Sequence, residues 1–183
     1  TTYKIRLKMK VTLGTFEIIS GSVVISDPCY TLDSWCSYKV KCQDGQYTAS
    51  VVKKKVNSWG ERIHELEAIL STKLDNCNYW KDVQSADIGV DSGQAGIFDS
   101  NFYQNNEAVK ESDFGSEPWD CGGPFYSACG SHTLSDKQAG VLSKGCISSS
   151  GFGDGSYNLQ VLEDENGIYG MKIVFIDEDQ ENA

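Results

Sequence analysis

The chain is short of positive charge: its 183 residues include 16 Lys and Arg against 26 Asp and Glu, for a formal net charge of −10 at pH 7. Binding to nucleic acid or to an anionic membrane surface depends on clustered Lys and Arg that neutralise phosphates. The composition therefore argues against both kinds of partner. No apolar run approaches the roughly 20 residues that a membrane-spanning helix needs, so we predict no membrane span.

Signatures of several metal, redox and nucleotide sites are also missing. The seven cysteines contain no Cys-x-x-Cys pair, which argues against a zinc ribbon or a thioredoxin-like site. There is no EF-hand spacing, and no Lys-Ser or Lys-Thr follows the glycine-rich segments as a phosphate-binding loop requires. Two cysteine states stay open: up to three disulfides with one spare thiol, which favours a secreted or extracellular protein, or reduced cysteines packed as small hydrophobes.

Alternation of apolar and charged residues predicts a strand over residues 3–13. Its outer face carries four basic side chains: Lys4, Arg6, Lys8 and Lys10. The C-terminal run 177–183 is acidic and is expected to fray. Two roles stay open for the basic face. It blocks unwanted pairing at a sheet edge, or it binds the acidic run of a neighbouring molecule and builds a homo-oligomer or filament.

A capping-box pattern, Ser58-Trp-Gly-Glu61, indicates the start of a helix, because its Ser and Glu side chains can satisfy each other's free backbone amides. The apolar residues that follow have helical spacing: Ile63, Leu66, Ile69 and Leu70. The sequence therefore predicts one amphipathic helix over about 59–71.

The rest of the chain reads as extended runs separated by turns, such as the hairpin pairs Asp44-Gly45 and Asn166-Gly167. The stretch 101–132 is polar, contains scattered Gly, Asn and Pro, and is predicted to be an irregular excursion with room for a helical turn, stapled by Cys121 or Cys129 if disulfides form. We therefore predict a single α+β domain over 1–183, a mostly antiparallel β-sheet or sandwich with the one helix packed on it.

Two segments, 87–99 and 148–157, are dense in Gly, Asp and Ser, which indicates special backbone shapes. Such aspartates either cap turns by accepting bonds from backbone amides or bind a cation or a polar ligand. The candidate ligand-binding residues are Asp27, Asp87, Asp91, Gln94 and Asp154. Calcium needs six or more oxygen ligands, and its candidate ligands are Asp87, Asp91 and Asp99.

Two further groups of side chains offer other chemistry. His132 lies three residues after Cys129, and a thiol nucleophile needs such a base within reach. The four Trp and nine Tyr residues serve either ordinary packing or a platform for a carbohydrate or a protein.

Five blocks of the sequence together resemble an uncharacterised family of domains of unknown function, found mostly in bacteria and their viruses. The blocks are Ser20 to Val24, Ser26-Asp-Pro-Cys-Tyr30 with Trp35-Cys36, Ser58 to Arg62, Asp87 to Phe98, which includes Gly-Val-Asp-Ser-Gly-Gln-Ala-Gly, and Ser148 to Tyr157, which includes Ser-Ser-Gly-Phe-Gly-Asp-Gly-Ser-Tyr. The resemblance spans 21–176. It implies a shared fold and no particular activity.

The leading interpretation is a non-enzymatic binding or structural module that is able to self-associate. The alternative is a hydrolase that uses the carboxylates with a metal, or a Cys-His pair. These interpretations differ in how the aspartates are used: a module binds them to backbone amides, whereas a hydrolase directs them into a concave pocket.

Overall fold

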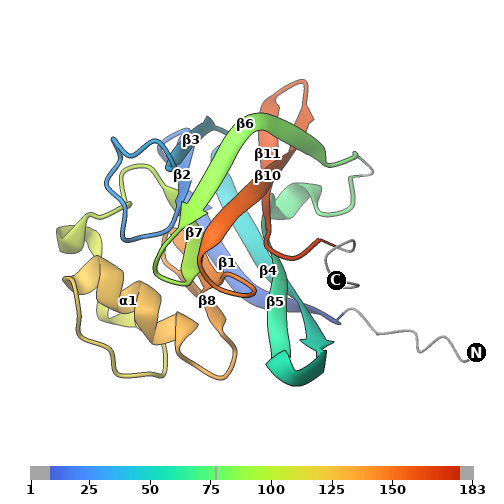
Figure 1. The fold of residues 1–183 in the computed structure, drawn as a ribbon. Coiled ribbons are helices and arrows are strands. Elements are labelled where there is room, and N and C mark those ends of the chain that lie inside the picture. The colour runs from blue at the N-terminus through green and yellow to red at the C-terminus, as the bar shows by residue number, and fades with distance from the viewer. Residues whose placement is uncertain (1–8, 77, 178–183) are drawn as a thin grey trace, which may run out of the picture.

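Two antiparallel β-sheets pack face to face, and an α-helix lies beside the smaller sheet (Figure 1). The computed structural model describes residues 9–76 and 78–177. This arrangement confirms the predicted fold class, a mostly antiparallel α+β sandwich. Lys4, Arg6 and Lys8 and residues 178–183 of the acidic run lie outside the described residues. No helix in the described part of the chain is long and apolar enough to cross a membrane.

The larger sheet has six strands in the order β1-β4-β5-β11-β10-β6, and every neighbouring pair is antiparallel. Their bounds are Met9–Ile18 (β1), Gly45–Val56 (β4), Gly60–Leu70 (β5), Gly167–Val174 (β11), Gly155–Asp164 (β10) and Lys81–Val90 (β6).

The smaller sheet has five antiparallel strands in the order β3-β2-β7-β9-β8. Their bounds are Tyr38–Lys41 (β3), Ser22–Ser26 (β2), Gln94–Asp99 (β7), Gly145–Ser149 (β9) and Ala139–Leu142 (β8). The helices are α1 (Pro124–Thr133) and the short 3₁₀ turns η1 (Asn57–Trp59), η2 (Ser71–Lys73), η3 (Asn106–Ala108) and η4 (Glu111–Asp113).

The apolar residues divide into two clusters. The main core fills the space between the sheets, and its large buried side chains include Phe16, Ile25, Tyr47, Leu66, Ile88 and Tyr169. The second cluster lies between the smaller sheet and α1, where Phe125 of the helix packs against Phe98 and Phe102. Full burial of one such side chain contributes roughly 1.5–3 kcal/mol, so this cluster accounts for the position of α1.

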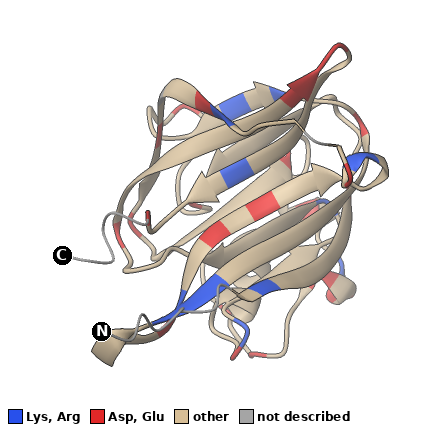
Figure 2. Ribbon diagram, turned by 90° about the vertical axis from the view of Figure 1, so that its right-hand side faces the viewer, with Lys and Arg blue, Asp and Glu red and all other residues tan. Residues whose placement is uncertain are grey.

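Acidic and basic residues lie side by side on neighbouring strands of the larger sheet (Figure 2). Cross-strand partners place one polar residue of each strand in a single row: Thr12, Ser50, Glu67, Lys172, Gln160 and Asp82. Glu67 is almost fully buried at the centre of this row. It accepts the hydroxyl of Ser50 at 3.1 Å, lies 3.7 Å from the ammonium of Lys172 and forms an ion pair with Lys10.

The predicted helix over 59–71 is wrong, because this segment is strand β5. The misleading spacing comes from a bulge: Val52 of β4 pairs with Glu65 while the next residue, Lys53, pairs with Ile63. The extra residue, His64, brings Ile63 and Leu66 to the buried face although they are three positions apart. The supposed capping box is the β4–β5 turn, which contains η1 and ends at Gly60 with a positive φ of 74°.

The observed helix, α1, lies inside the stretch 101–132 that was predicted to be irregular. Pro124 stands at its first turn, where the missing N–H costs nothing. The rest of the helix includes Ser127, Gly130 and Ser131, residues of low or middling helix propensity. Tertiary packing of Phe125 and Cys129 on the smaller sheet therefore determines the helix more than its local sequence does.

Candidate functional site

The carboxylate of Asp27 joins two turns at one end of the sandwich. Asp27 follows β2 and is fully buried. Its Oδ1 accepts the backbone N–H of Cys29 at 2.9 Å and the hydroxyl of Ser92 at 2.6 Å, while its Oδ2 accepts the backbone N–H groups of Asp91 and Ser92 at 2.9 and 2.7 Å. Four donors offset the cost of burying this polar group. The turn between β6 and β7 is therefore held against the start of the β2–β3 loop.

Tyr30 extends this network to the surface. Its hydroxyl donates a hydrogen bond to the exposed carboxylate of Asp91, and this bond raises the pKa of Tyr30. Its backbone carbonyl accepts the hydroxyl of Tyr103 at 2.6 Å and the amide of Gln104 at 2.7 Å. Three segments that are far apart in the sequence, the loop after β2, the turn after β6 and the turn after β7, are thus fixed to one another.

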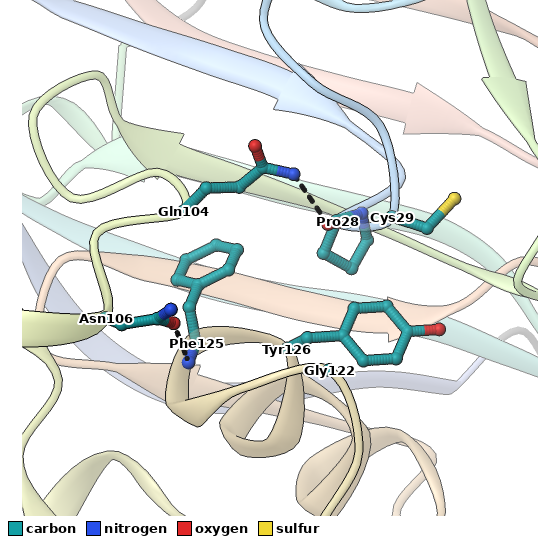
Figure 3. Close-up of a pocket in the computed structure, with 7 residues that line it drawn as sticks. All are labelled: Pro28, Cys29, Gln104, Asn106, Gly122, Phe125 and Tyr126. Carbon is teal, nitrogen blue, oxygen red and sulfur yellow. Dashed lines mark hydrogen bonds between the residues drawn. The ribbon is translucent and has the colours of Figure 1, made fainter.

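These segments and α1 enclose two hollows, and Tyr126 lines both of them. The first is about 430 Å³ and is shown in Figure 3. Its lining residues are Pro28, Cys29, Gln104, Asn106, Gly122, Phe125 and Tyr126. Gln104 donates to the carbonyl of Pro28 at 3.1 Å, and Asn106 accepts the backbone N–H of Phe125 at 3.0 Å. These two bonds fix the amide side chains at the rim of the hollow.

The second hollow is about 420 Å³ and lies along the next turns of α1. Its lining residues are Asp91, Ser92, Gln94, Trp119, Tyr126, Gly130, Thr133 and Leu134. Tyr126 belongs to both hollows, so we name the two together the Tyr126 groove. The groove has volumes in the range typical of small-molecule sites, which span roughly 300–1,000 Å³.

The structure brings three of the five predicted ligand-binding residues together. Asp91 and Gln94 line the groove, and the carboxylate of Asp27 holds the backbone of Asp91 and Ser92 behind this lining. Asp87 is exposed on the outer face of the larger sheet, opposite Asn158. Asp154 is exposed in the turn before β10, where Gly155 pairs with Val90 at the end of β6. Asp87 and Asp154 do not line the groove.

The predicted calcium ligands Asp87, Asp91 and Asp99 are not gathered into one group. Asp99 is fully buried, and its carboxylate accepts the backbone N–H groups of Ile19, Ser20 and Asn101. Within residues 9–76 and 78–177, no group of three or more His, Cys, Asp or Glu side chains is placed to hold a metal ion. Asp99, like Asp27, holds turns of the backbone in place by accepting their N–H groups.

The six cysteines in the described part of the chain are all free thiols, which matches the reduced alternative. Burial raises the pKa of Cys129 well above its ordinary value, and partial burial together with the Asp27 carboxylate raises the pKa of Cys29 to about 12. His132 bonds through Nε2 to the carbonyl of Asp113 at 2.8 Å, and burial lowers its pKa. Since the thiolate is the reactive form, these thiols are poorly suited to nucleophilic catalysis.

Of the predicted interaction residues, Lys10 is the one within the described ranges. It forms an ion pair with Glu67 of the same molecule. Lys4, Arg6 and Lys8 fall in the part of the chain that the structure does not describe.

Sequence reasoning raised the Trp and Tyr residues as a possible platform but did not place Trp119 and Tyr126 together beside a helix. Trp119 and Tyr126 lie in the stretch read as an irregular excursion, and Thr133 at the end of α1 was not singled out. Pro124 preceded by two glycines was the available signal for a helix start.

Comparison with known proteins adds no function. The chain has no match among family models, curated proteins or solved structures. The resemblance to a family of unknown function stays a prediction.

Proposed function

We propose that this protein is a non-enzymatic binding module and that the Tyr126 groove is its ligand site. One observation carries the proposal: the buried Asp27 network fixes three remote chain segments around a groove lined by aromatic side chains and by polar side chains that, apart from Asp91, are uncharged. A binding site gains affinity when its walls are held in place before the ligand arrives. In this protein the buried Asp27 supplies that rigidity.

The residues that line the Tyr126 groove suit a binding role better than a catalytic one. Asp91 is the one charged side chain among the described residues that line the groove, and its carboxylate is bonded to Tyr30. General acid–base chemistry uses a positioned proton donor and acceptor with suitable pKa values. The one thiol of the groove, Cys29, has a pKa raised to about 12. The hydrolase alternative therefore has less support than a binding role.

A fragment screen by ¹⁵N NMR tests this function. We expect weak ligands to shift the backbone signals of residues 91–94, 104–106 and 119–134. Tyr126→Ala should remove these shifts because Tyr126 lines both hollows. Tyr79→Ala is the matched control: Tyr79 is 88% exposed and precedes β6 at the opposite end of that strand from the groove. Binding that Tyr126→Ala leaves intact would contradict the proposal.

A further inference from the structure

One wall of the second hollow is aromatic. Trp119 is 39% exposed and lies against α1 at Gly130. A Cβ atom added at Gly130 would stand 2.5 Å from Cδ1 of Trp119 and 2.7 Å from its Nε1. The absence of a side chain at Gly130 therefore lets the indole approach the helix. Tyr126, one helical turn earlier, adds a second aromatic surface.

The rest of the hollow supplies hydrogen-bond donors and acceptors. The carboxylate of Asp91 accepts the hydroxyl of Tyr30 through Oδ2, and a carboxylate has room for further donors. Gln94 accepts the hydroxyl of Thr133 through Oε1 at 2.6 Å, and its amide group also carries two donor hydrogens. Ser92 donates to Asp27 at 2.6 Å and keeps acceptor lone pairs.

The charge of the groove selects against ionic ligands. No Lys or Arg is among the described residues that line it. Binding of phosphate or carboxylate groups typically uses such cations, and the overall charge of −10 opposes anions further. A cation would meet a single carboxylate that already accepts a hydrogen bond. The fitting ligand is uncharged and carries both apolar C–H faces and several hydroxyl groups.

We propose that the Tyr126 groove binds a neutral saccharide, an inference that rests on the proposed function. A sugar ring presents its C–H face to Trp119 or Tyr126, whose rings are large, rigid and amphipathic. Its hydroxyl groups donate to Asp91 and accept from Gln94. Because Tyr126 lines both hollows, a short oligosaccharide that passes this side chain would occupy both, with Gln104 and Asn106 facing its second part.

The test is titration with four neutral trisaccharides: cellotriose, chitotriose, maltotriose and mannotriose. Binding is followed by calorimetry and ¹⁵N NMR up to a ligand concentration of about 10 mM, which is tenfold above a millimolar Kd. At least one should bind and shift the signals of residues 91–94 and 119–134. Trp119→Ala and Asp91→Ala should each lower its affinity about tenfold or more. Trp59→Ala removes an indole that is 56% exposed on the β4–β5 turn and should leave affinity within about twofold.

Tetramethylammonium and inorganic phosphate serve as ionic probes in the same titrations. If one of them, or an unrelated fragment, occupies the groove while all four trisaccharides fail, the saccharide proposal is overturned and the binding function stands. If no probe or fragment shifts the groove signals, both proposals fail. If Trp59→Ala weakens saccharide binding as much as Trp119→Ala, the sugar site lies elsewhere and the assignment to the groove is wrong.

Discussion

Ser92 donates both its backbone N–H and its hydroxyl to the carboxylate of Asp27, a residue 65 positions earlier in the sequence. The two distances are 2.7 and 2.6 Å. Ser92 stands where the chain leaves β6 of the larger sheet and enters β7 of the smaller one. Asp27 therefore holds the crossing point between the sheets as well as one wall of the groove.

Asp27→Ala should be strongly destabilising. It leaves the backbone N–H groups of Cys29, Asp91 and Ser92 without their acceptor, and hydrogen bonds to a charged group contribute roughly 1.5–3 kcal/mol each. We expect urea denaturation to show a loss of about 3 kcal/mol or more in the free energy of unfolding. Asp154→Ala, an exposed control, should change it by about 0.5 kcal/mol or less. Equal effects of the two variants would refute this role of Asp27.

Gly130→Ala should weaken saccharide binding without lowering the stability of the fold. Alanine favours a helix over glycine by about 1 kcal/mol, so we expect unchanged or slightly higher stability. The new Cβ would stand 2.5 Å from Trp119 and must displace its partly exposed ring. The emission maximum of the tryptophan fluorescence, to which Trp119 contributes, should therefore shift, and saccharide affinity should fall. The midpoint temperature of thermal unfolding should stay the same or rise. Unchanged fluorescence and affinity would show that the indole position does not depend on Gly130.

His132 should make stability depend on pH below neutrality. Burial lowers the pKa of His132 from its ordinary value of 6.5. As the pH falls through 6.5, the unfolded chain takes up a proton that the folded protein does not, so stability is present above this pH and declines below it. His132→Gln cannot titrate. Denaturation curves between pH 7.5 and 5 should show a smaller decline for this variant, whereas parallel declines would assign the effect to other groups.

Self-association through the basic N-terminal face stays a prediction. If Lys4, Arg6 and Lys8 bind the acidic run of a neighbour, sedimentation velocity should detect oligomers at low salt that dissociate as the salt rises, since salt screens exposed charges. A variant with these three residues changed to Ser should remain monomeric. A wild-type protein that is monomeric at low salt and high concentration would rule this assembly out.

The sequence was sufficient to predict the fold class but not the elements that need tertiary information. The alternation in β5 is shifted by the bulge at His64, which only the pairing with β4 reveals. The helix α1 depends on packing of Phe125 against the smaller sheet rather than on helix propensity. Errors of this kind arise where long-range contacts override local pattern.

The hypothesis that the aspartates shape the chain holds for Asp27 and Asp99, whose carboxylates accept backbone N–H groups. It does not extend to Asp91, which bonds to the side chain of Tyr30 and faces the groove. Sequence alone cannot separate these cases, because each aspartate lies beside a strand end and the donors come from remote segments.

The polar row on the outer face of the larger sheet also determines how its strands align. A slip of one residue would exchange the two faces of a strand, and the apolar core forbids it. A slip of two residues would keep every face but would place Glu67 opposite Gly170 or Val174 instead of Lys172. The nearly buried carboxylate of Glu67 would then lose Lys172 and keep only Lys10 of its two cations, so this ion pair favours the native alignment of β5 and β11 over its nearest competitor.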